Sequence, residues 1–119
     1  FIQGMGWLTT EELCRDADGR LLTHAPSTYK IPAAHDCPAD FRVRLYPNPN
    51  RADTILRSKA VGEPPLLLAF SVWFALRDAV AAVGDGRTNP PLRAPATPEA
   101  ILDAVDAVRA QSPAANPAT

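Results

Sequence analysis

Cysteine and histidine are scarce in this chain, which has two of each among its 119 residues. His35 and Cys37 are the only close pair, while Cys14 and His24 lie well apart from them, so the tight spacing of a zinc site is missing. Neither histidine has a serine or cysteine partner that the sequence identifies, and a hydrolytic triad is therefore unsupported. With no other sign of secretion, the cysteine content predicts free thiols in a cytoplasmic protein.

Net charge is also nearly absent, at −1, which argues against a nucleic-acid or anionic-membrane partner because both require a net basic face. The longest apolar run, Leu66 to Leu76, is too short to predict a bilayer crossing. No N-terminal stretch combines basic residues, an apolar run and a cleavage site. The chain begins at Phe1 rather than at methionine, and its first residues read as the continuation of an apolar segment. This predicts further residues upstream of Phe1.

Positive charge does gather in one place, residues 42–59, which contain four arginines and a lysine offset only by Asp53. Two interpretations stay open for this basic stretch. It forms solvated charges on a strand and a loop, or it faces an anionic cofactor or partner. Glycine is sparse as well, and Gly4 and Gly6 make no phosphate-binding fingerprint, because the third glycine and the preceding strand are absent.

Turn and strand signals dominate residues 14–58. Asp16 to Gly19 predicts a turn before a short strand at residues 20–23. Phe41 to Leu45 alternates apolar and charged residues, which predicts a half-buried strand with Phe41, Val43 and Leu45 inward. Upstream, residues 1–13 predict the end of a helix or a short helical turn, with Thr9 or Thr10 as an N-cap before two acids.

Helical signals dominate the second half. Pro64 suits the first turn of a helix and Gly84 suits the position just after its end, which predicts a helix over residues 64–83. Residues 66–76 are apolar on every face, so this helix is expected to be buried on all sides. A chain of this size can hardly surround such a helix, so we expect it to pack inside something larger or against a partner.

A second helix is predicted after Thr97, which fits an N-cap, with Pro98 at the first helical position and Glu99 in the first turn. Its apolar stripe consists of Ile101, Ala104, Val105 and Val108. Residues 112–119, small residues and proline, predict a disordered tail. Together these patterns predict an α+β fold over residues 1–111, with short strands, one long buried helix and one amphipathic C-terminal helix.

Glu63 is the most promising candidate for chemistry. It precedes Pro64, which favours an extended backbone at Glu63 and places it at or just before the helix start. Gly62 permits an unusual turn and the close approach of a ligand. From spacing alone two roles remain open, a helix-capping acid or a carboxylate aimed into a cleft as a general base. Four of the aromatic residues are more typical of core packing than of stacking platforms, namely Trp7, Phe70, Trp73 and Phe74.

Five stretches resemble the molybdenum-binding large subunit of the xanthine dehydrogenase family, in the family's order over residues 1–109. They are Gly6-Trp7-Leu8-Thr9-Thr10-Glu11-Glu12-Leu13, Ala25-Pro26-Ser27-Thr28-Tyr29-Lys30-Ile31-Pro32, Arg57-Ser58-Lys59-Ala60-Val61-Gly62-Glu63-Pro64-Pro65-Leu66, Ser71-Val72-Trp73-Phe74-Ala75-Leu76-Arg77-Asp78-Ala79 and Ala94-Pro95-Ala96-Thr97-Pro98-Glu99. The second stretch favours xanthine dehydrogenase over the related aldehyde oxidases. The resemblance implies that residues 1–111 are the C-terminal part of a molybdopterin-binding domain.

The resemblance implies that Glu63 is the general base beside molybdenum in the oxidation of purines such as hypoxanthine and xanthine, with water as the oxygen source. It also implies that Lys59, Ala60, Val61 and Gly62 lie along the molybdenum–molybdopterin cofactor, and it assigns no metal ligand to this chain. The expected partners are the upstream remainder of the catalytic subunit, a subunit or domain with iron–sulfur clusters and FAD, and the full oligomeric enzyme. The alternative is a truncated, non-catalytic remnant that only docks to the rest of the subunit.

Overall fold

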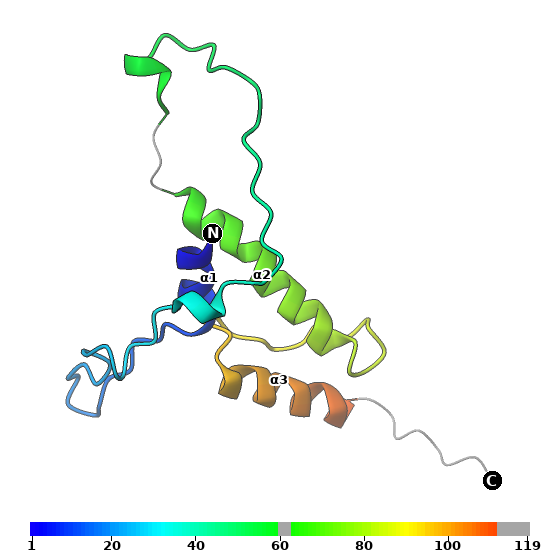
Figure 1. Cartoon of the computed structure of the whole chain (residues 1–119). Coiled ribbons are helices and arrows are strands. Elements are labelled where there is room, and N and C mark those ends of the chain that lie inside the picture. Colours follow the sequence, from blue (N-terminus) through cyan, green and yellow to red (C-terminus); the bar gives the residue numbers. More distant parts are fainter. Residues whose placement is uncertain (60–62, 112–119) are drawn as a thin grey trace.

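The computed structural model describes residues 1–59 and 63–111, and in these residues the regular structure is helical (Figure 1). The elements are α1 (Ile2–Thr9), the short 3-10 helices η1 (Ala34–Asp36) and η2 (Ile55–Arg57), α2 (Pro64–Ala81) and α3 (Pro98–Gln111). The predicted tail at residues 112–119 lies outside the described residues. The two long predicted helices are therefore present, and α1 precedes them.

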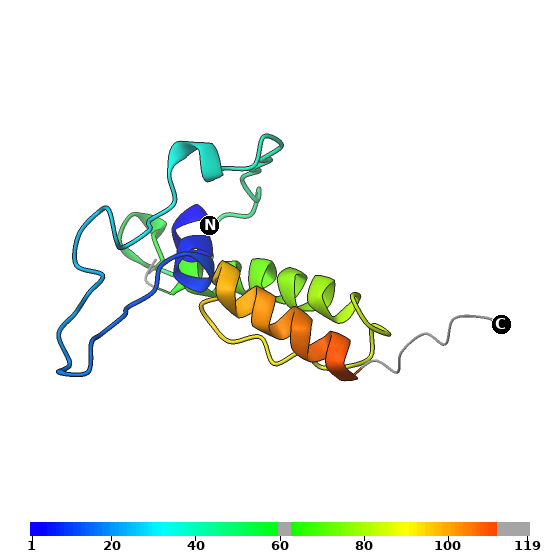
Figure 2. The same ribbon diagram turned by 90° about the horizontal axis from the view of Figure 1, so that it is seen from below.

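Helix α2 is the central element, and the other two helices pack against different parts of it. In Figures 1 and 2, α1 lies against the first half of α2, whereas α3 runs beside its second half. The main hydrophobic core lies between α2, α3 and the segment that joins them. It consists of Val80, Leu92, Ala96, Ala100, Ala104 and Val108, with Trp73, Leu76, Ile101 and Val105 packed around it.

Helix α3 forms as its sequence predicts. The Thr97 side-chain oxygen accepts a hydrogen bond from the Ala100 backbone N–H at 3.3 Å, and Pro98 is the first helical residue. This cap satisfies one of the N–H groups that a helix start leaves without a partner. Ala104 and Val108, both from the predicted stripe, are fully buried against α2, and the amphipathic pattern is thereby confirmed.

Helix α2 begins at Pro64 as predicted but ends earlier than its glycine suggests. Its last helical residue is Ala81, and the Ala82 N–H still bonds to the Asp78 carbonyl. Gly84 does not take the left-handed backbone expected after the helix. That conformation falls to Gly86, with φ of 71°, whose N–H returns to the Ala81 carbonyl. The chain reverses direction at Gly86 and not at Gly84, because the turn after α2 contains more residues than one that a single capping glycine closes.

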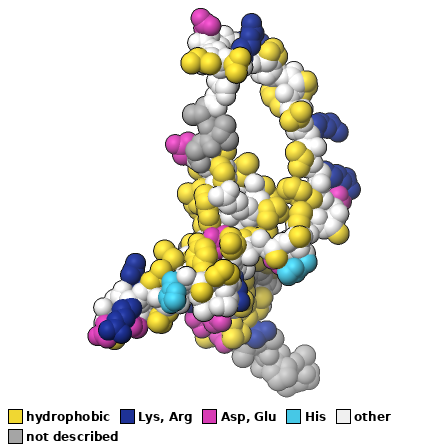
Figure 3. Space-filling view, turned by 60° about the vertical axis from the view of Figure 1, so that its left-hand side comes forward, with side chains coloured by type: hydrophobic (Ala, Val, Ile, Leu, Met, Phe, Trp, Pro, Cys, Tyr) yellow, Lys and Arg dark blue, Asp and Glu magenta, His cyan; other side chains and the backbone are white. Residues whose placement is uncertain are grey.

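Most of the apolar surface of α2 is not covered by this chain. Leu67 is 64% exposed and Phe74 50% exposed, and Ala69, Val80 and Ala81 are its buried residues. The space-filling view shows hydrophobic side chains gathered over the body of the molecule (Figure 3). The expectation that one small chain cannot surround this helix is confirmed, and burial on all sides requires something beyond these residues.

By length and composition alone, α2 qualifies as a membrane span, with 18 residues of mean hydropathy 1.3 and 17% of that window buried. The sequence prediction, which rested on the run Leu66–Leu76, did not anticipate this. One such helix is weak support for a span, because the core helix of a soluble protein passes the same test. Arg77 and Asp78 also lie within α2, and the Arg77 guanidinium donates to the Asn89 side chain. We therefore interpret α2 as a core helix of a larger fold.

The predicted short strands do not form in the described residues, where the nearest feature is one isolated antiparallel bridge between Arg15 and Leu21. Residues 37–59 instead extend as an open arm with η2 at its far end (Figure 1). Phe41, Val43 and Leu45 are exposed, Leu45 by 90%, so their predicted inward orientation is wrong in this chain. A strand needs a neighbour for its backbone hydrogen bonds, and no backbone bond joins residues 41–45 to another described segment.

At the N-terminus the structure corrects the prediction that Thr9 or Thr10 is an N-cap. Thr9 ends α1 and Thr10 is its C-cap, so neither is an N-cap. The Thr9 hydroxyl donates back to the Met5 carbonyl at 2.7 Å, and a threonine bonded in this way suits a helix end. The turn at Asp16 to Gly19 is confirmed, with Gly19 at φ of 81° and the Asp16 carboxylate accepting from the Arg20 N–H.

Candidate functional site

Glu63 stands at the N-cap position of α2, but its side chain makes no capping hydrogen bond. Its backbone is helical, with φ of −85° and ψ of −25°, and not extended as predicted. The Glu63 carbonyl accepts hydrogen bonds from the Leu66 and Leu67 N–H groups, at 3.1 and 3.3 Å. These bonds close the first turn and require helical geometry, which outweighs the preference for extended backbone that Pro64 imposes.

The Glu63 carboxylate is exposed and has no ion pair or hydrogen bond to another described residue. A capping acid would use its oxygens on the backbone N–H groups in the first turn of its own helix. Pro64 and Pro65 supply none, and the Leu66 N–H bonds to the Glu63 carbonyl instead. The carboxylate oxygens therefore remain available to accept a proton or hydrogen bond from outside the chain. Of the two roles left open by the sequence, the capping role is not realised in this structure.

The predicted cofactor-contacting residues are only partly described. Ala60, Val61 and Gly62 lie outside the described residues. Lys59 is exposed and lines an open hollow of about 480 Å³ together with residues 48–52, among which Arg51 carries the second positive charge. The two cations, Arg51 and Lys59, give this hollow a positive lining. Both belong to the segment that precedes Glu63 in the sequence.

Just before the motif, the backbone takes an unusual path that the sequence does not reveal. Leu56 and Arg57 have φ of 51° and 55°, a left-handed conformation that residues with side chains rarely adopt. Two side chains hold it. Asn50 donates to the Arg57 carbonyl at 3.0 Å, and the Thr54 hydroxyl donates to the Ser58 carbonyl at 2.7 Å. Backbone strain of this kind is common near functional sites, so Asn50 and Thr54 join the candidate site as supports of its approach.

On its other side, the start of α2 is packed directly against α1 at Gly4. A Cβ placed on Gly4 would overlap the Pro65 carbonyl and lie 2.9 Å from the Ala69 Cβ. Gly4 is buried, and Ala69 has no exposed surface. The sequence analysis had weighed Gly4 only as part of a phosphate-binding motif. No signal within α1 itself could reveal the contact, since its partner lies about sixty residues further along the chain.

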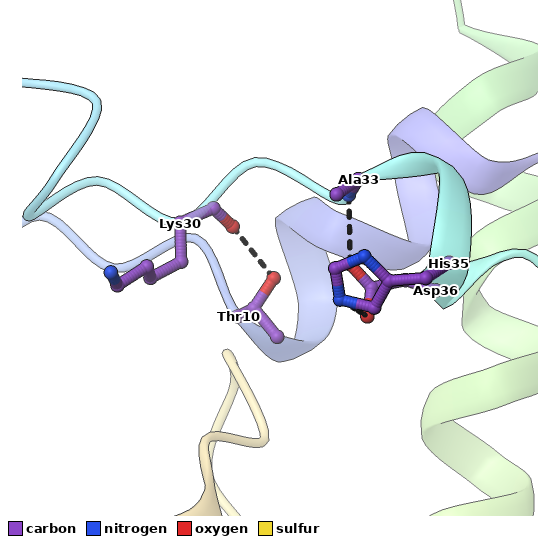
Figure 4. Close-up of polar contacts among 5 residues, drawn as sticks. All are labelled: Thr10, Lys30, Ala33, His35 and Asp36. Atoms are coloured by element: carbon purple, nitrogen blue, oxygen red, sulfur yellow. Dashed lines mark hydrogen bonds and ion pairs between the residues drawn. The ribbon is translucent and has the colours of Figure 1, made fainter.

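The C-terminal end of α1 is in turn fixed to residues 29–36 (Figure 4). The Thr10 hydroxyl donates to the Lys30 carbonyl at 2.8 Å, and the Asp36 carboxylate accepts from the Ala33 N–H at 2.7 Å. Glu11 is 7% exposed, and its hydrogen bond with the Tyr29 hydroxyl raises the pKa of that tyrosine above its usual value. The resembling stretches 6–13 and 25–32 thus fold against each other as a support for α1.

The described residues contain no group of three or more histidine, cysteine, aspartate or glutamate side chains that could hold a metal ion. Cys14 and Cys37 are free thiols, as expected. Burial, followed by the charge of Glu12, raises the pKa of the Cys14 thiol and so disfavours its metal-binding thiolate form. Among the described residues, Glu63 thus remains a candidate for chemistry without a group of possible metal ligands beside it.

Comparison with known proteins indicates the family of this chain. The sequence family described as the molybdopterin cofactor-binding domain matches residues 1–38. The chain is 45% identical over 123 residues to "Xanthine dehydrogenase/oxidase" of Gallus gallus, covering 100% of this chain and 9% of that protein. It is 47% identical over 112 residues to the protein of the same name in Felis catus, and 44% identical over 104 residues to "Aldehyde oxidase 2" of Macaca fascicularis.

These alignments cover nearly all of this chain but span less than a tenth of the length of each of these relatives. The resemblance found in the sequence is confirmed: this chain is related over its whole length to a segment of the molybdenum hydroxylases, the family that includes xanthine dehydrogenase.

Proposed function

We propose that this chain is the part of a purine-oxidising molybdenum hydroxylase that supplies the general base, Glu63. The observation that carries the proposal is the Glu63 carboxylate, which stands at the start of α2 without capping it and without a partner among the described residues. It lies within the stretch of residues 57–66 that most specifically resembles the family. The names of the relatives support the oxidation of a purine.

In this proposal the molybdenum cofactor, when bound, provides the oxygen to be inserted and accepts the two electrons removed from the substrate. Glu63 takes the proton from the water-derived oxygen that attacks the substrate carbon. The base is held by its backbone, because its carbonyl belongs to the first turn of α2, while its side chain has no partner within residues 1–59 and 63–111. A base positioned in this way contributes on the order of 10²–10⁴-fold to the rate. Iron–sulfur clusters and FAD elsewhere in the full enzyme would then take the electrons onward.

The exposed apolar face of α2 supports the second part of the proposal, that the remainder of the same catalytic subunit covers this helix. This face exposes five large apolar side chains, and contiguous exposed apolar surface of this kind marks a place where another part of a protein packs. They are Leu66, Leu67, Leu68, Phe70 and Phe74. A chain that spans less than a tenth of its relatives is expected to be enclosed by the rest of them. The same face suits a non-catalytic remnant that only docks. An open reading frame that continues upstream of the Phe1 codon favours the enzyme, and a nearby start codon favours the remnant.

The Glu63→Gln substitution in the assembled enzyme tests the proposed base. Glutamine keeps the size and the helix-start position but loses the basic oxygen. We expect the rate of substrate-dependent enzyme reduction to fall by at least about 10²-fold, with molybdenum content and cofactor absorption unchanged.

Glu99→Gln is the matched control, because Glu99 is an exposed acid in the first turn of α3, away from the candidate site. This variant should reduce at the wild-type rate. A Glu63→Gln enzyme that retains more than about a tenth of the wild-type rate at every pH would remove Glu63 from the mechanism.

A further inference from the structure

Helix α1 contains two glycines in eight residues, although glycine weakens a helix relative to alanine. Both are buried, and in both cases other atoms occupy the place of a Cβ. At Gly4 these atoms are the Pro65 carbonyl oxygen and carbon, the latter at 2.6 Å. A backbone carbonyl inside a helical turn cannot rotate away as a flexible side chain can, so the absence of a side chain at Gly4 is required for this contact.

The Gly4 contact falls on the turn that carries Glu63. Pro65 is two residues after Glu63, and the Leu66 and Leu67 N–H groups bind the Glu63 carbonyl within that same turn. Ala69, one turn further along α2, packs beneath Gly4 with no exposed surface. Because the Pro65 contact is with the backbone of the first turn, a shift of that turn relative to α1 moves the Glu63 backbone with it.

We propose that Gly4 is a positioning residue for Glu63: it lets α1 seat against the backbone of the first turn of α2, and this contact sets where the Glu63 carboxylate lies. The inference rests on the proposed role of Glu63 as a base. It also assigns α1 a task that its sequence does not reveal. Helix α1 is the support that keeps the start of α2 from sliding, and its own end is fixed by the Thr10 bond to Lys30.

Gly6 supplies an internal control on the same helix. A Cβ on Gly6 would overlap Pro32 and approach the Glu11 carboxylate at 2.5 Å, and neither belongs to α2. Gly6→Ala therefore introduces the same methyl group into the same helix, at a buried position, but directs it away from the turn that carries Glu63. Any effect that arises only from crowding or destabilising α1 is shared by both variants.

The test compares Gly4→Ala and Gly6→Ala in the full molybdenum enzyme. Backbone hydrogen exchange of a peptide covering residues 63–70 reports on the first turn of α2 and does not depend on activity. We expect Gly4→Ala to accelerate this exchange and to slow reduction by xanthine about 10- to 100-fold, since a misplacement of about 1 Å can cost that much. Molybdenum content should stay at the wild-type level, and Gly6→Ala, which crowds Pro32 instead of α2, should change both the exchange and the reduction rate clearly less than Gly4→Ala.

Each alternative outcome overturns a definite statement. Unchanged exchange in Gly4→Ala means that α1 does not position the turn, and faster exchange with a normal rate means that the turn does not position the base. Equal effects from both variants reduce Gly4 to a packing role. A fully active Glu63→Gln enzyme refutes the proposed function. Hydrogen exchange of residues 63–70 in Gly4→Ala would then still show whether the contact between Gly4 and Pro65 holds the first turn of α2. If the Gly4→Ala enzyme does not accumulate, Ala69→Ser is tested instead, because it adds a single oxygen atom to the α2 side of the same contact. Hydrogen exchange and the reduction rate are then measured in the same way.

Discussion

The exposed face of α2 leads to opposite expectations for the isolated chain and for the whole enzyme, and Leu67→Gln tests both. In the isolated chain Leu67 is 64% exposed, so replacing it should reduce dye binding to apolar surface and self-association. In the whole enzyme the remainder of the subunit is proposed to cover this position. The same substitution should there be harmful.

The magnitude follows from the exposure. Burying a whole leucine side chain contributes about 1.5–3 kcal/mol, so the two-thirds of Leu67 still exposed in this chain should be worth about 1–2 kcal/mol when covered. A buried glutamine amide without partners adds roughly 1–3 kcal/mol of cost. We expect a total loss of about 2–5 kcal/mol in the enzyme. Thermal inactivation of the enzyme and dye fluorescence of the isolated chain measure the two sides.

Leu102→Gln serves as the control for both measurements. Leu102 is 59% exposed on α3, next to Asp103 and one turn before Asp106, on a face expected to stay in solvent. It should change inactivation of the enzyme little. If Leu67→Gln leaves the inactivation rate of the enzyme unchanged, the face of α2 stays open in the enzyme and our interpretation of it is wrong.

Three further predictions concern other parts of the chain. Arg42→Ala should leave turnover nearly unchanged, because Arg42 pairs only with Asp40 at an exposed site, whereas Arg57→Ala, beside the motif, should lower it; equal losses in steady-state turnover would contradict this. Thr97→Ala should destabilise α3 by about 1 kcal/mol through loss of its cap, seen as faster hydrogen exchange in that helix alone. Alkylation should label exposed Cys37 before Cys14, because a raised pKa leaves less Cys14 thiolate at neutral pH; mass spectrometry showing the reverse order would refute it.

The sequence alone predicted those features whose causes lie within one turn of the chain. Thr97 and Pro98 start α3, Pro64 starts α2, and Gly19 completes the turn that begins at Asp16, since each of these signals acts on its immediate neighbours. Glu63 was singled out in the same way, because it lies directly before Pro64 at a helix start, whereas its role as a base was implied by the family resemblance and stays a prediction. The apolar composition of residues 66–76 also predicted that this chain alone cannot cover α2.

Tertiary structure decided the features that depend on distant partners. The strand predicted at residues 41–45 does not form here, because alternation specifies which side chains share a face but supplies no neighbouring strand to bond with. Glu63 has a helical backbone because the Leu66 and Leu67 N–H groups bind its carbonyl. The contact between Gly4 and Pro65 joins segments about sixty residues apart, and close packing of this kind is set by the three-dimensional fit of two helices and leaves no periodic trace in either sequence.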